Sequence, residues 1–218
     1  MHAFYDEMAK RGADIGFDEF KGYLANLFES NAPGFDEPGF TLFMRWVKEL
    51  GYKLGVEIPS GEIRPMVNKL VRLWHRGMYL DPETVPVLRE LGEHHIVGLI
   101  TNWEHTPRIY ELVDELGMHG LFDSIIVSDD VGCAKPEPRI FEIALEKHRL
   151  KPDEAVYVGD MNVDVQGAMS AGLKPVLIQR LDSNGTWDPY TDKKKCYYAQ
   201  TEVFVIHRLY DLFDIVKC

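Results

Sequence analysis

The sequence predicts an α/β protein in which a doubly wound parallel sheet core follows an N-terminal module built only of helices. After about residue 80, short apolar runs rich in valine and isoleucine alternate with helix-like segments. That alternation is typical of parallel strands covered by helices on both faces. Before residue 80, apolar residues recur at helical spacing instead. We therefore expect two domains, residues 1–79 and residues 80–218.

Four helices are expected in the first domain, over residues 4–10, 17–30, 42–52 and 60–76. The second helix has a regular apolar stripe, since Phe17, Phe20 and Leu24 recur on one face. Ser60 precedes the fourth helix and is a candidate N-cap. Two Pro-Gly pairs within residues 31–39 predict a loop.

Five strands are expected in the second domain, over residues 96–100, 124–127, 155–158, 174–178 and 203–206. Helices are expected between and after them, ending near residue 116 and covering residues 138–148, 163–171 and 209–216. Residues 81–84 connect the two domains. The strand runs are short and apolar throughout, so we expect strands that are buried on both faces.

The composition limits the partners that this protein can have. A net charge of −11 argues against a nucleic-acid surface, because such surfaces need clustered lysine and arginine. The three cysteines are odd in number and form no CxxC pair, which favours reduced thiols. No apolar run approaches the ~20 residues that span a bilayer, and the first residues lack the pattern of a signal peptide. We expect a cytoplasmic protein that binds neither nucleic acid nor membranes.

Two aspartates follow the third expected strand. Asp160 comes directly after Gly159, at the strand end where ligands bind in open α/β sheets. Asp164 follows four residues later, on the same side of the helix start. Two close carboxylates repel unless a cation lies between them, and hard oxygen ligands favour Mg²⁺. An N-cap and a solvated acid would give the same pattern, so both interpretations stay open for the pair alone.

Two further segments carry polar groups in positions that could bind phosphate. Thr101 and Asn102 follow the first expected strand, where a hydroxyl and a backbone N–H could cradle a phosphate. Lys135 stands just before a helix that begins with proline. A helix cap and a solvated surface lysine are the ordinary alternatives for these residues.

Taken in chain order, the segment with Thr101 and Asn102, the segment with Lys135 and the segment with Asp160 and Asp164 resemble motifs two, three and four of the haloacid dehalogenase superfamily, whose core is Rossmann-like. The resemblance implies that Thr101, with Asn102 beside it, binds the transferring phosphoryl group and that Lys135 steadies the phosphate and the nucleophile. It also implies that Asp160 and Asp164 hold Mg²⁺. The helical domain resembles the cap that this family inserts after its first strand. The spaced acid pair resembles the phosphatase branch, so the expected substrate is a small phosphorylated metabolite.

The family's first motif, a strand that ends in Asp-x-Asp-Gly-Thr, has no match ahead of the cap-like helices. In the family, its first aspartate attacks phosphorus and its second acts as general acid and base. We therefore expect residues 1–218 alone to have little or no activity. Residues 181–186 imitate the motif through Asp182, but they follow a different strand, and a turn is the expected interpretation.

The sequence leaves two functions open. The first is a phosphatase whose first central strand lies outside these residues; the second is a non-catalytic descendant that binds metal, phosphate or a protein partner. The family's strand order would place the missing strand between the strands that end near Thr101 and Asp160. We expect these two strands either to pair directly or to accept a strand from another chain. Exchange of a strand or of the cap between copies would produce a homo-oligomer.

Overall fold

The computed structural model describes residues 1–30, 33–180 and 203–216. The chain forms two compact units. The first consists of Met1–Tyr79 together with Trp103–Leu112, and the second of Leu80–Asn102 together with Val113–Cys218. The imitation motif around Asp182 lies outside the described residues. None of the described helices combines the length and the apolar character needed to cross a bilayer.

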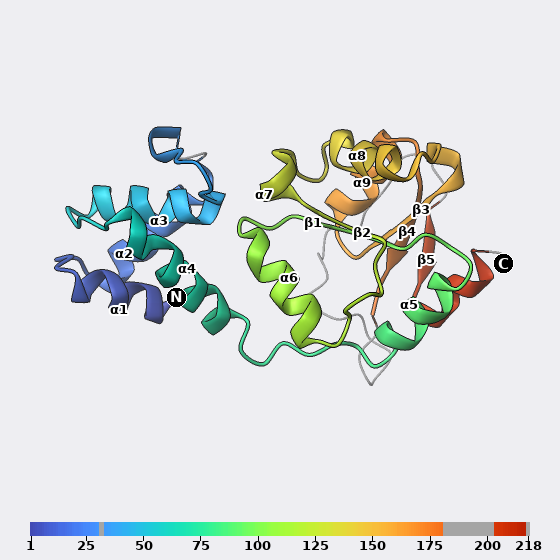
Figure 1. The fold of residues 1–218 in the computed structure, drawn as a ribbon, viewed down its shortest axis with the longest axis horizontal. Coiled ribbons are helices and arrows are strands. Elements are labelled where there is room, and N and C mark those ends of the chain that lie inside the picture. The colour runs from blue at the N-terminus through green and yellow to red at the C-terminus, as the bar shows by residue number, and fades with distance from the viewer. Residues whose placement is uncertain (31–32, 181–202, 217–218) are drawn as a thin grey trace. The chain divides into compact units, whose positions relative to one another are not determined.

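The first unit is helical, as Figure 1 shows for its N-terminal part. Its elements are α1 (His2–Lys10), α2 (Phe17–Leu27), η1 (Pro33–Phe35), α3 (Leu42–Lys53), α4 (Ser60–Trp74) and the larger part of α6 (Thr106–Glu115). Ser60 is the first residue of α4 rather than its cap, which is Pro59. The Ser60 hydroxyl instead donates to Glu37 and accepts from Lys48, so the N-cap prediction was wrong.

The segment that precedes α6 is tied to the N-terminal helices by a buried polar network. The Phe43 N–H donates to the Glu104 carbonyl at 2.9 Å. His105 is 1% exposed; its Nδ1 lies 2.8 Å from the Thr41 hydroxyl and its Nε2 lies 2.9 Å from Asn68 Oδ1. Burial, assisted by the charge of a nearby arginine, lowers the pKa of His105 to about 4. The imidazole is therefore neutral near pH 7, with each ring nitrogen paired.

The second unit contains five strands in two parallel sheets among its described residues. One sheet pairs β1 (Gly98–Thr101) with β2 (Ser124–Val127). The other has the order β3 (Val156–Gly159), β4 (Lys174–Ile178) and β5 (Phe204–Ile206). All five predicted strands are present, and β1 and β3 are shifted by one or two residues along the chain.

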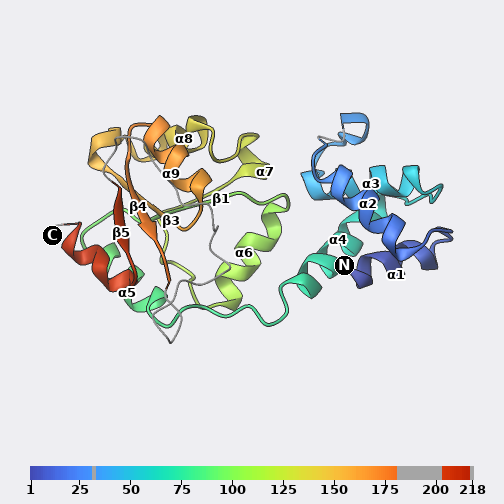
Figure 2. The ribbon, with the colours of Figure 1, turned by 180° about the vertical axis from the view of Figure 1, so that it is seen from behind.

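Helices cover the strands of this unit on both faces (Figures 1 and 2). Its helices and turns are α5 (Thr84–Gly92), α7 (Ser128–Val131), α8 (Pro138–His148), η2 (Pro152–Glu154), α9 (Asn162–Ser170) and η3 (Leu209–Asp214). Tyr157 packs with the cluster from α8 and α9, whereas Val156 and Val158 pack with α5 and η3. Because side chains alternate between the faces of a strand, this division shows a doubly wound sheet. The last predicted helix, over residues 209–216, is present as a 3₁₀ helix over Leu209–Asp214.

Among the described residues, β1 pairs with β2 and β3 pairs with β4, and β1 and β3 are not paired with each other. Direct pairing of β1 with β3 was therefore a wrong prediction, while a strand from another chain stays a prediction. The expected burial is found for most residues of β2 and β4 but not for β1 and β3. Every residue of β3 is half-buried, and β1 is exposed at Gly98 and half-buried elsewhere, while most residues of β2 and β4 are buried. β3 lies at one edge of its sheet, but edge position alone does not decide burial, since β2 is also an edge strand and is mostly buried.

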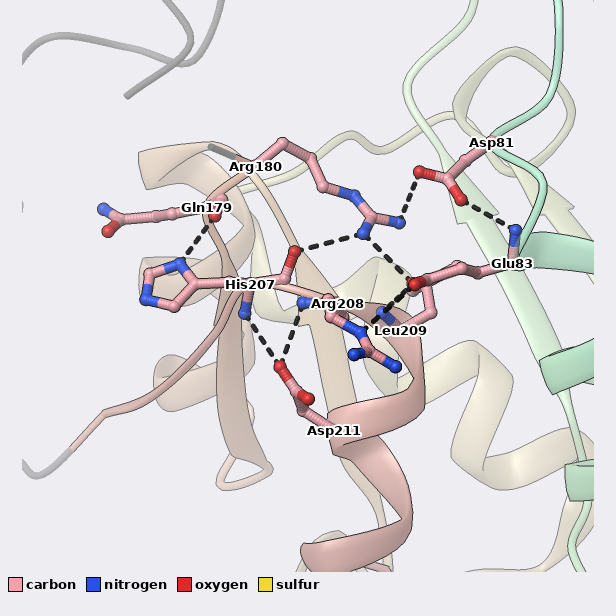
Figure 3. A network of polar contacts seen from close by, with 8 residues as sticks. All are labelled: Asp81, Glu83, Gln179, Arg180, His207, Arg208, Leu209 and Asp211. Atoms are coloured by element: carbon pink, nitrogen blue, oxygen red, sulfur yellow. Dashed lines mark hydrogen bonds and ion pairs between the residues drawn. The ribbon is translucent and has the colours of Figure 1, made fainter. Parts of the chain in front are cut away.

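A network of ion pairs and hydrogen bonds fixes the chain where it enters the second unit (Figure 3). Arg180, after β4, contacts Asp81 at 2.7 Å and Glu83 at 3.2 Å. The Glu83 carboxylate also accepts from the Leu209 N–H at 2.7 Å and pairs with Arg208 at 3.3 Å. Burial alone would raise the pKa of Glu83, but the Leu209 hydrogen bond and the arginine charges outweigh it and lower the pKa. Glu83 thus joins the start of α5 to the start of η3.

The neutral state of His105 predicts how stability changes with pH. The unfolded chain takes up a proton at this histidine near pH 6.5, whereas the folded chain does so only near pH 4. The unfolded state therefore binds more protons in this window, and the free energy of unfolding should fall as the pH drops from about 6.5 to about 4. Urea unfolding of the wild type and His105→Gln at several pH values should show a weaker pH dependence in the variant. His119→Gln, which changes an exposed histidine, is the control, and equal slopes for all three proteins would contradict the prediction.

Glu83 provides a second test of the fold. Glu83→Ala removes the acceptor for Leu209 and leaves two arginines without this carboxylate. We expect a loss of about 1–3 kcal/mol in the free energy of unfolding, since hydrogen bonds to charged groups are stronger than neutral ones. Chemical unfolding measures the effect, with Glu90→Ala on the exposed face of α5 as the matched control. Equal losses in the two variants would show that the Glu83 network does not stabilise the unit.

Candidate active site

The predicted site residues of the second unit gather where β1 and β3 end. The carbonyl of Ile100 in β1 accepts hydrogen bonds from Lys135 Nζ at 3.4 Å and from the Tyr157 hydroxyl at 3.3 Å. Lys135 lies in the loop before α8 and Tyr157 lies in β3. Side chains from two other segments thus reach the backbone of β1 at one place.

Asn102 fixes the loop that carries Lys135. Its side-chain amide donates from Nδ2 to the Lys135 carbonyl at 2.9 Å, and its Oδ1 accepts from the Lys135 N–H at 2.8 Å. This reciprocal pair satisfies both backbone polar groups of one residue. Asn102 therefore positions Lys135 relative to the end of β1, a role that the sequence did not suggest.

Lys135 forms a buried ion pair with Asp164. Its Nζ lies 2.8 Å from Asp164 Oδ1 and 3.0 Å from the Tyr157 hydroxyl. The side chains of Lys135 and Asp164 are 12% and 4% exposed. Because lysine and aspartate are rarely buried unless they are paired, the interpretation of Lys135 as a solvated surface residue is excluded.

Asp164 is held on both of its carboxylate oxygens. Besides Lys135, Oδ1 accepts from the Tyr157 hydroxyl at 3.3 Å, while Oδ2 accepts from the Met161 N–H at 2.9 Å. Burial, followed by the charge of Asp164, raises the pKa of Tyr157, so this hydroxyl stays protonated and can donate. Tyr157 is a member of the site that sequence reasoning missed. Its one signal in the sequence is a hydroxyl within an otherwise apolar strand.

Gly159 is required by the close approach of Asp164. A Cβ atom at this position would lie 2.4 Å from both Cβ and Cγ of Asp164. Real side chains do not approach so closely, and Asp164 cannot move away without losing its contacts with Lys135 and Met161. The glycine therefore allows the buried carboxylate to pack directly against the end of β3.

Asp160 lies at the surface beside this buried group. Loss of hydration, followed by the negative charge of Asp164, raises the pKa of Asp160. A cation between the two acids would relieve that repulsion. Mg²⁺ is commonly held by one or two carboxylates, with water and phosphate oxygens as its other ligands. The pair fits such an ion, although the described residues contain no cluster of three or more acids, histidines or cysteines that could hold a metal.

Thr101 ends β1, opposite Val127 in the register, and is half-buried. The structure brings Asn102, Lys135 and Asp164 into one contact network. Asp160 adjoins that network, and Thr101 precedes Asn102 directly in the chain. The five residues that the sequence nominated therefore fall at the ends of β1 and β3, in the loop that carries Lys135 and in the first turn of α9.

The buried pair predicts a large effect for one substitution. Lys135→Ala leaves the Asp164 carboxylate without its cation in a nearly closed environment. Removing one partner of a buried ion pair costs about 3–5 kcal/mol, so we expect a loss of this order in the free energy of unfolding measured with urea. Lys147→Ala, which removes an exposed lysine of α8, should change it by less than about 0.5 kcal/mol. Similar losses for both variants would mean that the pair does not stabilise the fold.

Solved structures of known proteins share this fold. A phosphatase from Thermococcus onnurineus matches 98% of this chain and 86% of its own, with a TM-score of 0.64 and 24% identity. A 2-haloacid dehalogenase from Pseudomonas syringae matches 98% of this chain and 87% of its own, with a TM-score of 0.67 and 21% identity. At these identities the likeness concerns the fold alone.

Relatives of known sequence are similar over parts of the chain. A glyceraldehyde 3-phosphate phosphatase of Methanothermobacter thermautotrophicus is 29% identical over 171 residues, covering 72% of this chain and 75% of the relative. One from Methanopyrus kandleri is 33% identical over 138 residues, which are 62% of this chain and 56% of the relative. A phosphoglycolate phosphatase of Yersinia pestis is 36% identical over 98 residues, covering 44% of this chain and 42% of the relative. The chain thus spans about half the length of several relatives that it matches.

The family model for haloacid dehalogenase-like hydrolases matches residues 48–178, which is more than half of the 218-residue chain. The matched region contains all five residues that the sequence nominated, from Thr101 to Asp164. The fold, the order of the motifs and this match agree, and the chain belongs to the haloacid dehalogenase-like hydrolase family.

Proposed function

We propose that this protein is a Mg²⁺-dependent phosphatase of a small phosphorylated metabolite. The observation that supports the proposal most directly is the buried Lys135–Asp164 pair, which Asn102 and Tyr157 hold where β1 and β3 end. Several relatives are named phosphatases of small metabolites, glyceraldehyde 3-phosphate and phosphoglycolate. These relatives, together with the spaced acids Asp160 and Asp164, favour phosphate ester hydrolysis over the removal of halogen.

Each nominated side chain has a task in this proposal. The Thr101 hydroxyl donates to an oxygen of the phosphoryl group, and the Lys135 ammonium offsets its negative charge. Asn102 keeps Lys135 in place through its two backbone hydrogen bonds. Asp160 and Asp164 would hold Mg²⁺, which when bound neutralises the charge of the phosphoryl oxygens.

The attacking carboxylate is proposed to come from a strand that ends in Asp-x-Asp-Gly-Thr and inserts between β1 and β3. The burial pattern supports this position, because the two strands that should be central are the half-buried ones. At this end of β1, the Ile100 carbonyl accepts hydrogen bonds from the side chains of Lys135 and Tyr157. In the reaction, a carboxylate oxygen bonds to phosphorus while the alcohol oxygen leaves and takes a proton from the second aspartate. Water then hydrolyses the phosphoaspartate and releases phosphate.

Restoring such a strand tests the proposal. Residues 1–218 alone should hydrolyse p-nitrophenyl phosphate at the background rate, with or without Mg²⁺. Fusing a strand, its Asp-bearing loop and a short connection (roughly 20–25 residues) ahead of Met1 should produce Mg²⁺-dependent turnover. In the fused protein, Asp160→Asn should lower kcat/KM on the order of 100-fold or more, whereas Asp153→Asn, at an exposed acid of η2, should not change it.

Other outcomes would contradict the proposal in different ways. Efficient turnover by residues 1–218 that survives Asp160→Asn would place the chemistry elsewhere, and loss of that turnover in Asp182→Ala would place it in residues 181–186. A folded fusion protein that binds Mg²⁺ and phosphate but never turns over would favour the second function, a non-catalytic binding protein.

A further inference from the structure

The ammonium group of Lys135 is surrounded by three oxygen atoms. Its Nζ lies 2.8 Å from Asp164 Oδ1, 3.0 Å from the Tyr157 hydroxyl and 3.4 Å from the Ile100 carbonyl. All four residues belong to the second unit. An ammonium has three N–H groups, so the three oxygens match its donors one for one. A phosphoryl oxygen that approaches Lys135 must therefore take the place of one of these partners.

The three partners differ in how readily an anion can replace them. Asp164 is a buried carboxylate, and its contact with Lys135 is the shortest of the three and is charge-assisted. The Ile100 carbonyl and the Tyr157 hydroxyl are neutral oxygens, which are weaker acceptors than a charged phosphate oxygen. An anion therefore replaces Ile100 or Tyr157 at Lys135, and the free energy of the lost contact is subtracted from that of binding.

The Tyr157 hydroxyl is fixed by the packing of its ring. The ring packs edge-on against Phe141 of α8 with a centroid distance of 4.8 Å, and it adjoins the apolar cluster of α8 and α9. Lys135 Nζ also lies 5.6 Å from the ring centroid, within the range of a cation–π contact. Removing the hydroxyl alone would therefore leave the ring and its contacts in place.

Loss of the hydroxyl would change the donors of Lys135 more than the groups around it. Asp164 would keep Lys135 and the Met161 N–H as partners, and the Ile100 carbonyl would keep Lys135. Lys135 would have one N–H without its present acceptor, in a side chain that is only 12% exposed. An unpaired donor in such surroundings is costly, and the flexible lysine stem can turn it toward an arriving anion.

We propose that Tyr157 is a positioning residue that lowers the affinity of the site for phosphate by occupying one N–H of Lys135. In the wild type, an anion replaces one acceptor of Lys135 by another, so its net gain is small. Without the hydroxyl, the anion would pair an N–H that otherwise has no acceptor, and binding would gain the whole hydrogen bond. Tyr157 thus acts on phosphate through Lys135 and does not need to touch the anion.

Weaker retention of phosphate favours turnover, an inference that rests on the proposed function. A phosphatase must release inorganic phosphate after each reaction, and phosphate that stays bound at Lys135 blocks the site. Substrate and product present similar phosphoryl oxygens to this lysine. Tighter binding of both would lower KM without raising kcat, so a hydroxyl that competes for the ammonium is no disadvantage to the reaction.

Phosphate binding to residues 1–218 tests the role of Tyr157 without requiring catalysis. In calorimetric titrations with inorganic phosphate and Mg²⁺, Tyr157→Phe should bind at least about tenfold more tightly than the wild type, the gain expected for one hydrogen bond to a charged group. Tyr52→Phe removes a hydroxyl from a side chain that is 76% exposed, and it should leave the affinity unchanged. Urea unfolding checks that both variants are folded.

A purely structural role for Tyr157 predicts the opposite result. If the hydroxyl only held Lys135 in its binding position, Tyr157→Phe should weaken the binding of phosphate. Weaker or unchanged binding in Tyr157→Phe would overturn the proposal, and so would the absence of phosphate binding in all three proteins. A gain in affinity that Tyr52→Phe shares would also overturn it.

The fused protein separates this inference from the proposed function. If it is active, Tyr157→Phe should lower the inhibition constant of phosphate at least about tenfold and lower KM for p-nitrophenyl phosphate, with no increase in kcat. An unchanged inhibition constant would overturn the role of Tyr157 and leave the phosphatase proposal intact. If the fused protein is inactive but Tyr157→Phe still tightens phosphate binding, the phosphatase proposal fails while the role of Tyr157 stands.

Discussion

The buried contact between Lys135 and Asp164 organises the site end of the second unit. Each charge would be costly to bury alone, so each requires the other and the hydrogen bonds around it. These requirements explain several neighbours. The Tyr157 hydroxyl and the Met161 N–H complete the partners of the carboxylate, and Gly159 leaves the space that the carboxylate occupies. One ion pair thus accounts for residues in β3, at the start of α9 and in the loop before α8.

Charge also explains why the two aspartates differ. Asp164 is buried and pairs with Lys135, whereas Asp160 is exposed. Loss of hydration, followed by the negative charge of Asp164, raises the pKa of Asp160. An additional cation therefore gains most from contact with Asp160. The negative net charge of the whole chain does not prevent phosphate binding, since the local field at the site is set by Lys135 and by any bound metal.

The sequence predicted the fold well where one strong pattern decided it. The predicted limits of α8 and β4 were correct, because a proline begins α8 and a short, mainly apolar run defines β4. Ser60 was misassigned as a cap, since its hydroxyl bonds to two charged partners that are distant in the sequence. Contacts between residues that are distant in the sequence also limited what could be predicted of the site. Motif order nominated Asp164, but the part played by Tyr157 depends on tertiary contacts with Lys135 that no local pattern contains.

In the short segment Thr101–Thr106, neighbouring residues make tertiary contacts with different parts of the chain. Asn102 belongs to the second unit and holds the loop of Lys135, whereas Trp103, the next residue, belongs to the first unit and packs on the ring of His75 with a centroid distance of 4.8 Å. Two positions later, His105 is buried within the first unit with both ring nitrogens paired. Successive side chains here meet different requirements: Asn102 positions a backbone, and His105 fills a buried polar site. The local sequence alone therefore does not reveal which of these residues serves the candidate active site and which serves the packing of the first unit, because tertiary contacts decide both.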